Sequence, residues 1–196
     1  MLPQIVLASQ SPARRKLLET AGLKFDVRPS HFDEDRIQSD NLAQLVETLA
    51  LKKAETVAAQ VTEPALVIGA DSLFTLEGEV YGKPKDAAEA LLRLHHMQGK
   101  MGELLTGHAL IDTKRSRQVS RVRTTAVHLA PMNDAEIRHY IATGEPMACA
   151  GNFALEGYGG VFVDRVEGCH TNVIGLSLPL LRQMFAALDY DITDFW

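Results

Sequence analysis

Cationic and acidic side chains lie in several separate segments of this chain, at positions where helices, strands and loops could present them to a common site. Arg14 and Arg15 open a predicted helix, Lys53 lies within another, Asp71 follows an apolar run, and Lys83 stands in a Gly-Pro loop. Cations neutralise a polyphosphate, carboxylates hold a divalent metal, and one carboxylate orients or deprotonates a water. Together these residue types match what phosphoanhydride hydrolysis requires.

The first cationic segment follows the apolar run 5–8. Ser11 suits an N-cap and Pro12 the first helical position, so we expect a helix that ends before Gly22. Arg14 and Arg15 then fall in the first turn, where each costs about 0.3–1 kcal/mol against the helix dipole. A bound anion would reverse the sign of that cost. The alternatives are a phosphate cradle and a solvated helix with two surface arginines.

Lys53 belongs to a helix that we expect from residue 40 or 41 to about 60. Its apolar stripe has helical spacing, and Lys53 falls in the middle of the stripe whereas Lys52 falls at its rim. A lysine on a core-facing stripe either extends its ammonium to the surface or points it into a polar cavity. The apolar members of the stripe are Leu42, Leu45, Val46, Leu49 and Val57.

Asp71 follows the continuous apolar run 65–70, which is typical of a central strand buried on both faces. Carboxylates at the C-terminal ends of such strands are where α/β proteins keep their chemistry, although an Asx-turn cap explains the residue equally well. Residues 74–81 then predict a hairpin. Gly82 and Pro84 make a stiff turn that presents Lys83, whose alternative is an ordinary exposed loop lysine.

The remaining segments predict alternating helices and strands, without repeats or linkers. The glycine-rich segment 149–160 implies unusual backbone conformations, but its spacing is not that of a dinucleotide-binding loop. We expect strands at 24–28, 104–112, 119–129 and 161–163, and helices at 86–99, 133–142 and 177–188.

The composition excludes several classes of protein. A net charge of -5 and a pI of about 5.8 argue against a nucleic-acid coat or a binder of anionic membranes, although a local positive pocket stays compatible with a phosphorylated ligand. Cys149 and Cys169 fit no disulfide framework and no zinc spacing, so we expect small core or near-core residues in a reducing compartment. No apolar run reaches the length of a membrane span or a secretory signal. We therefore expect a soluble, cytoplasmic protein.

The order and spacing of the charged segments resemble the Maf family of nucleoside triphosphate pyrophosphatases, once described as septum-formation inhibitors. The resemblance covers almost the whole chain, and the combination of motifs is specific although no single motif is. The matching segments are 7–15, Asp33-Glu34, 49–54 with Lys53 in the family's position, 69–72, Gly82-Lys83-Pro84, 150–157 and 172–176.

This resemblance implies one Maf-like domain over residues 1–196. The implied α/β fold has a mixed, strongly twisted sheet flanked by helices, and two lobes around a deep cleft. It also implies hydrolysis between the α- and β-phosphates with Mg²⁺ or Mn²⁺, and a homodimer. Asp71 would be the proton acceptor that activates water and would lie near the metal, with Glu34 as a second metal ligand. The triphosphate would be bound by Ser9, Arg14, Arg15, Lys53 and Lys83.

Three positions of the resemblance bear on the base of the nucleotide. The branch that prefers dTTP and UTP has Pro, Thr and Gln where this chain has Ala13, Ser72 and Glu156. The 7-methyl-GTP branch shares the glutamate but has a bulky aromatic in place of Ala13. A carboxylate at Glu156 favours a base edge that presents N–H donors, since an unpaired buried acceptor costs about 1–3 kcal/mol.

Two other functions compete with this interpretation. One is a regulatory protein of cell division that acts through protein or nucleic-acid contacts, for which Arg117, Arg121 and Arg123 offer an arginine stripe on one strand face. On an acidic protein such a stripe is more often a solvated face. The other is a phosphatase that releases orthophosphate, which product analysis distinguishes from a pyrophosphatase.

Overall fold

The computed structural model describes residues 2–196, and these residues form two compact units. Unit 1 comprises the chain up to Asp71 together with residues 106–123 and 175–196. Unit 2 comprises residues 72–105 and 124–174. The strands β3, β5 and β6 contribute residues to both units.

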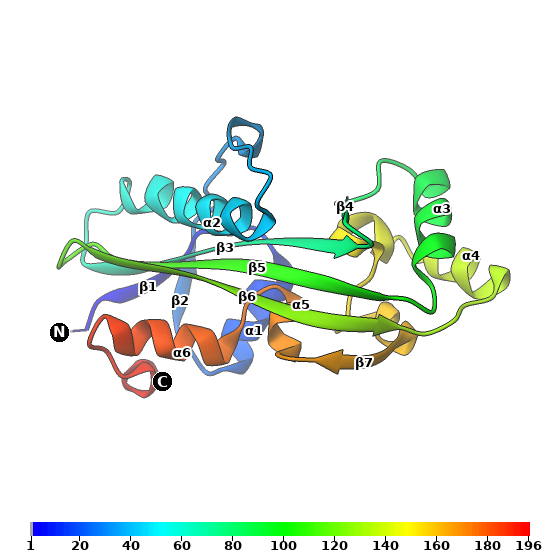
Figure 1. Ribbon diagram of the computed structural model, residues 1–196. Coiled ribbons are helices and arrows are strands. Elements are labelled where there is room, and N and C mark those ends of the chain that lie inside the picture. The colour runs from blue at the N-terminus through cyan, green and yellow to red at the C-terminus, as the bar shows by residue number, and fades with distance from the viewer. Residues whose placement is uncertain (1) are drawn as a thin grey trace. The chain divides into compact units, whose positions relative to one another are not determined.

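The fold is α/β, with an open, twisted, mixed sheet and flanking helices, as predicted (Figure 1). The strands are β1 (Gln4–Leu7), β2 (Phe25–Val27), β3 (Ala65–Leu76), β4 (Glu79–Tyr81), β5 (Met101–Asp112), β6 (Arg117–Leu129) and β7 (Val163–Glu167). The helices are α1 (Pro12–Thr20), α2 (Leu42–Ala58), α3 (Ala87–Met97), α4 (Asp134–Ala142), α5 (His170–Ile174) and α6 (Leu178–Ala187). Single 3₁₀ turns lie at Glu34–Arg36, Glu145–Ala148, Ala150–Asn152, Tyr158–Phe162 and Ile192–Phe195.

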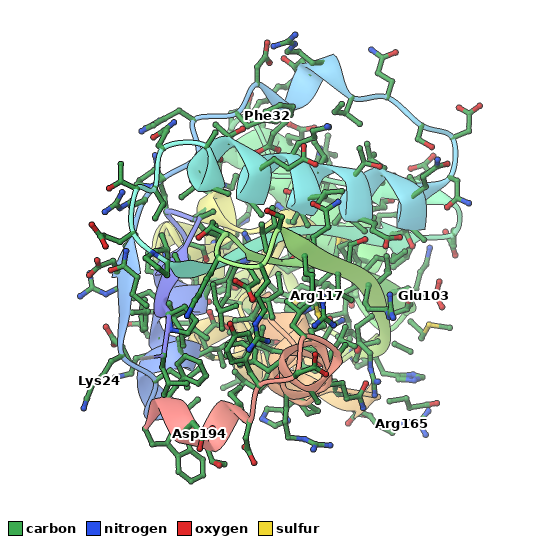
Figure 2. The ribbon with its side chains drawn as sticks, turned by 90° about the vertical axis from the view of Figure 1, so that its left-hand side faces the viewer. Lys24, Phe32, Glu103, Arg117, Arg165 and Asp194 are labelled. Atoms are coloured by element: carbon green, nitrogen blue, oxygen red, sulfur yellow. The ribbon has the colours of Figure 1, made fainter. Side chains whose placement is uncertain are left out.

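In unit 1 the strand order is β2-β1-β3-β5-β6. β1 runs parallel to both of its neighbours, with Ile5 opposite Phe25 and Leu7 opposite Ile68. Helix α2 covers one face of these strands and α6 lies on the other (Figure 1). Figure 2 shows the loop of Phe32 beside α2, and the C-terminal turn of Asp194 on the side of α6. The core under α2 is made of small and β-branched residues: Val6, Ala8, Ala50, Ala54, Val57, Ala65, Val67, Ala109 and Ile111.

In unit 2 the later part of β3 pairs antiparallel with β4, and β6 pairs antiparallel with β7. The β3–β4 turn has positive φ at both Glu77 and Gly78, which is the backbone of a tight hairpin and confirms the predicted turn. The core of this unit contains larger side chains than the core under α2, and several of them are aromatic. Its members include Phe74, Leu76, Tyr81, Leu94, Met97, Leu104, Val127, Tyr140 and Phe153.

Two predicted elements were wrong in extent. The strand expected to end before Asp71 continues to Leu76, because β1 is its partner in the first half and β4 in the second half. Residues 161–163 do not form a strand of their own: a 3₁₀ turn reaches Phe162, and β7 begins at Val163. The short helix α5 lies where the sequence predicted no helix.

The cysteines and the helices bear on two expectations about the chain as a whole. Cys149 is half-buried and Cys169 is buried, and both are free thiols, as expected. Within residues 2–196, no helix is both long enough and apolar enough to cross a membrane.

Candidate functional site

Asp71 lies on β3 just past the end of the parallel ladder with β1. The last register pair of that ladder is Leu7 with Ile68, and the Ala8 N–H donates to the Ile68 carbonyl at 2.8 Å. Among the described residues of unit 1, the ladder between β1 and β3 reaches no further than Ile68. The Ala70 carbonyl there accepts a hydrogen bond from Arg14 Nη1 at 2.9 Å. Asp71 thus stands where parallel pairing ends, although the strand itself continues.

Helix α2 lies directly against the backbone of β3 because residue 69 has no side chain. A Cβ built on Gly69 would lie 2.2 Å from the Ala50 carbonyl oxygen and 2.9 Å from the Ala54 Cβ. Residues 69 and 71 point to the same face of the strand, so Asp71 also faces α2. Lys53 lies on α2 between the two alanines, and this close approach places its side chain over Asp71.

The Lys53 ammonium is the centre of the site in unit 1. Its Nζ lies 2.6 Å from Asp71 Oδ1 and 2.7 Å from Glu34 Oε1. The Lys53 and Asp71 side chains are only 11% and 12% exposed, whereas Glu34 is 56% exposed. The ammonium therefore points into a polar cluster instead of extending to the surface, which decides between the two alternatives for this lysine. The structure brings together three of the predicted residues from a helix, a strand and a 3₁₀ turn.

Arg14 is held by backbone acceptors as well as by side chains. Its Nε donates to the Gly175 carbonyl at 2.8 Å, and its Nη1 donates to the Ala70 carbonyl and, at 3.2 Å, to Ser9 Oγ. Burial lowers the pKa of Arg14, while the carboxylates of Asp71 and Glu34 oppose that shift. The guanidinium thus lies within the field of the same two carboxylates that face Lys53.

Helix α1 begins as predicted, and three further residues predicted to bind the nucleotide lie at or just before its first turn. Ser11 is the N-cap and accepts from the Arg14 N–H at 3.4 Å, while Ser9 Oγ accepts from the Ser11 N–H at 3.2 Å. Ala13 is half-buried. Arg15 is 63% exposed and pairs with Glu19 one turn further along the helix at 2.8 Å. Its predicted contact with substrate therefore competes with an ion pair on its own helix.

The carboxylates suit a hard divalent cation. Glu34 and Asp71 both lie within hydrogen-bond distance of one ammonium, so their oxygens already converge on a cationic centre. Magnesium is commonly bound by one or two carboxylates, with water and substrate phosphates as its other ligands. The described residues contain no group of three or more His, Cys, Asp or Glu side chains arranged for a metal. The donor set fits a metal that arrives with a phosphorylated substrate.

Unit 2 holds the other predicted residues. Ser72 follows Asp71 on β3, and Lys83 is exposed in the loop before α3, where the Gly82 carbonyl accepts from Arg93 Nη1 at 2.7 Å. Burial and the carboxylates of Glu156 and Glu145 raise the pKa of Cys149 to about 11, and Lys83 opposes that shift. The charges of Lys83 and Glu156 therefore both influence the pKa of the Cys149 thiol. Burial, with Glu145 adding to it, raises the pKa of Glu156.

The glycine-rich segment is built around Glu145. The carboxylate of Glu145 accepts from Tyr140 Oη and the Gly159 N–H at 2.8 Å, and from the Tyr158 N–H at 2.9 Å. A Cβ on Gly157 would lie 2.0 Å from Glu145 Oε2. A side chain at residue 157 would therefore displace the Glu145 carboxylate from its backbone hydrogen bonds, which gives one reason for a glycine in this segment.

A cavity of about 560 Å³ beside α4 holds none of the predicted site residues. It is lined by Glu136, His139, Tyr140, Thr143, Glu145, Gly157, Tyr158, Val161 and Phe162. The lining is mostly apolar and lacks the cations that a triphosphate needs. We therefore place the chemistry at the Lys53 cluster and not at this cavity.

The arginine stripe of β6 is partly engaged within unit 1. Arg117 donates to the carboxylate of Asp189 and, at 2.9 Å, to the Ala187 carbonyl. Arg121 donates to the Ser120 carbonyl at 2.8 Å. These contacts use guanidinium groups that nucleic-acid binding would need, and the regulatory interpretation stays a prediction.

Two residues around Arg14 were assigned no role from the sequence, although Gly175 belongs to the matching segment 172–176. Gly175 supplies the carbonyl that holds the guanidinium, and its φ of +119° lies in a region that favours glycine. His108 is fully buried on β5 and bonds the segment that carries Gly175. The only sequence signal was a histidine inside an otherwise apolar strand.

The similarity to known proteins extends over nearly the entire chain. A family model described as Maf-like protein matches residues 4–188. A nucleoside triphosphate pyrophosphatase of Synechococcus sp. (strain JA-2-3B'a(2-13)) is 59% identical over 100% of both chains. Another of that name, from Nostoc punctiforme, is 56% identical over 100% of this chain and 98% of its own.

Among solved structures, a nucleoside-triphosphatase / dITP/XTP pyrophosphatase of Mycobacterium abscessus has a TM-score of 0.40 at 14% identity, over 66% of this chain and 75% of its own. The extent of the family match and of the sequence identity is decisive: the chain belongs to the Maf family.

Proposed function

We propose that this chain is a nucleoside triphosphate pyrophosphatase that cleaves its substrate between the α- and β-phosphates. The observation that carries the proposal is the Lys53 ammonium held between the carboxylates of Asp71 and Glu34. Relatives of the same family that carry this enzyme name align over the full chain, which supports the reaction class.

In the proposed reaction Asp71 accepts a proton from the attacking water. The water oxygen bonds to one of the two phosphorus atoms that flank the α–β bridging oxygen, and the bond from that phosphorus to the bridge breaks. The products are a nucleoside monophosphate and pyrophosphate. Asp71 is suited to this role because its carboxylate is 12% exposed and fixed on a strand, so it loses little freedom when it orients water.

Lys53 and Arg14 are proposed to counter the charge of the triphosphate. Both cations are already oriented by carboxylates or carbonyls of unit 1, so substrate binding need not order flexible side chains. Ser9 shares a hydrogen bond with Arg14 and adds a hydroxyl beside it. Lys83 and Arg15 remain predicted triphosphate contacts, and a homodimer remains a prediction of the family resemblance.

Glu34 and Asp71 are the proposed ligands of the divalent metal. A bound Mg²⁺ or Mn²⁺ would act as a Lewis acid on phosphate oxygens. Lys53 would then exchange its carboxylate partners in part for phosphate oxygens, which are acceptors of the same charge. This exchange explains why an ammonium and two carboxylates converge at one point before substrate arrives.

Ala13, Ser72 and Glu156 are proposed to influence the choice of base. The raised pKa of Glu156 means that its carboxyl group is protonated over a wider pH range than a solvated glutamate. In the ionised form it accepts from base N–H groups such as those of a guanine edge. We therefore propose a preference that leans away from dTTP and UTP.

The test is a panel of canonical and modified triphosphates with product identification, run with Mg²⁺ and with Mn²⁺. The proposal expects pyrophosphate and monophosphate as the products, and no activity once the metal is chelated. Release of orthophosphate and a diphosphate would reject the pyrophosphatase assignment. A clear preference for dTTP or UTP would reject only the proposed roles of Ala13, Ser72 and Glu156 in the choice of base.

A further inference from the structure

His108 is a fully buried histidine whose two ring nitrogens have different partners. Its Nε2 lies 2.8 Å from the Ser177 N–H, which can only donate, so Nε2 is the acceptor. Its Nδ1 lies 3.0 Å from the Thr106 carbonyl, which can only accept, so Nδ1 carries the proton. Both partners together define one neutral tautomer. Burial and the nearby charges of Arg14 and Arg123 lower the pKa of His108 to about 4, while hydrogen bonds of the ring with the Thr106 and Arg121 backbone oppose that shift.

The Ser177 end of this contact belongs to the short connector between α5 and α6. Ser177 is fully buried and is the N-cap of α6, and Leu176 beside it is fully buried as well. Two residues before Ser177, the Gly175 carbonyl accepts the Arg14 Nε hydrogen at 2.8 Å. The connector thus contacts His108 at Ser177 and Arg14 at Gly175, and all four residues belong to unit 1.

We propose that His108 is a positioning residue that orients Arg14 through the Gly175–Ser177 connector. The imidazole fixes the backbone at Ser177, the left-handed φ of Gly175 aims its carbonyl, and that carbonyl holds the guanidinium. A neutral ring is required, since a protonated Nε2 cannot accept from Ser177 and would add a second cation beside Arg14. The consequence for catalysis rests on the proposed function, in which Arg14 binds the triphosphate.

The experiment compares the whole chain with its His108→Leu and His108→Gln variants. Leucine removes the acceptor, whereas a glutamine side chain can place its carbonyl oxygen near the position of Nε2. Tyr190→Phe is the matched control, because it removes another hydrogen bond of unit 1, the one from Tyr190 Oη to Asp112 at 2.9 Å. The first readout is solvent exchange of the Arg14 Nε hydrogen by ¹⁵N NMR, assigned with Arg14→Lys. This readout needs no enzyme activity.

We expect His108→Leu to speed exchange of the Arg14 Nε hydrogen by about tenfold or more, with His108→Gln and Tyr190→Phe close to the parent. In steady-state kinetics His108→Leu should raise KM by about tenfold with a smaller change in kcat, and His108→Gln should restore KM. Unchanged exchange in His108→Leu would overturn the proposal. An equal KM change in Tyr190→Phe would also overturn it, because the effect would then follow general stability.

Failure of the proposed function gives a different pattern. The parent protein would then release no pyrophosphate, while the exchange measurement still decides whether His108 orients Arg14. If His108→Leu does not fold, His108→Asn replaces it, because its shorter amide keeps a polar group but does not reach Ser177. The same faster exchange is expected for His108→Asn, and unchanged exchange would contradict the proposal.

Discussion

The ammonium of Lys53 lies 2.6 Å from the carboxylate of Asp71, although the two residues are 18 positions apart and belong to a helix and a strand. Both side chains are almost nine-tenths buried. Loss of one partner from a buried ion pair leaves an uncompensated charge, which is far costlier than loss of an exposed pair. The pair is therefore expected to matter for both stability and activity.

Lys53→Met should lower kcat/KM for pyrophosphate release by about 10²–10³-fold, because it removes a preorganised cation from the site. Lys52→Met is the matched control. Lys52 is the preceding residue, 43% exposed, and pairs only with Glu55 on its own helix among the described contacts. Its kinetics should stay near those of the parent. Equal losses in the two variants would show that α2 charge in general, and not the Asp71 contact, supports the reaction.

Gly69→Ala should destabilise the protein by about 1–3 kcal/mol, since the new methyl group would lie 2.2 Å from the Ala50 carbonyl oxygen and force α2 away from β3. The free energy of unfolding in urea measures the effect. Gly82→Ala adds the same methyl group where no atom lies within 4 Å, and should change stability by no more than about 0.5 kcal/mol. A neutral Gly69→Ala would mean that the close packing of α2 is not required.

Local sequence signals were sufficient for the starts of α1, α3 and α4. Ser11 with Pro12, Asp86 and Asn133 all cap the helices that the sequence predicted, because capping depends on residues within three positions of each other. Lys53 was also recognisable, since a cation on an apolar stripe conflicts with helical periodicity. Its partners were not, because they depend on which strand α2 covers.

The parts that were missed depend on contacts distant in the sequence. The continuation of β3 through Asp71 arises from a change of strand partner, which no local pattern reports. Glycine is needed at residues 69 and 107 because helix α2 packs directly against both. A Cβ built at either position would lie within 2.2 Å of the α2 backbone. His108 resembled an ordinary strand residue because its partner Ser177 is 69 positions away.

Glu145→Gln should destabilise the protein by about 1–3 kcal/mol, because the new amide group donates where the carboxylate accepted from a backbone N–H. The carboxylate now accepts from Tyr158 and Gly159 backbone groups and from Tyr140, whose pKa is raised by burial and by this hydrogen bond. Urea unfolding is the measurement, with Glu103→Gln on an exposed position as the control. Equal unfolding free energies for the two variants would contradict the account of this loop.

Stability should fall when the pH is lowered from about 6.5 to about 4. The pKa of His108 is about 4 in the folded state, against an ordinary value of 6.5, so the unfolded chain binds the proton first in that window. The charged groups that disfavour protonation are Arg14 and Arg123. The loss attributable to His108 is about 3 kcal/mol over the whole window and nothing above it.

The pH effect of His108 is measured as a difference between two proteins. Urea unfolding of the parent and of His108→Gln at pH 7 and pH 4.5 cancels the contribution of the other titrating groups. The parent should lose more stability than the variant between the two pH values. The same loss in both proteins would show that His108 is not the group responsible.

Asp71→Asn offers the most direct test of the proposed reaction, measured as the rate of pyrophosphate release at saturating triphosphate and Mg²⁺ with binding followed in parallel by calorimetry. Asparagine keeps the size of the side chain but cannot accept the proton of the attacking water. The account predicts a fall in kcat of about 10²–10⁴-fold while the variant stays folded and binds the triphosphate within about tenfold of the parent affinity. A kcat near that of the parent would contradict the assignment of Asp71 as the base.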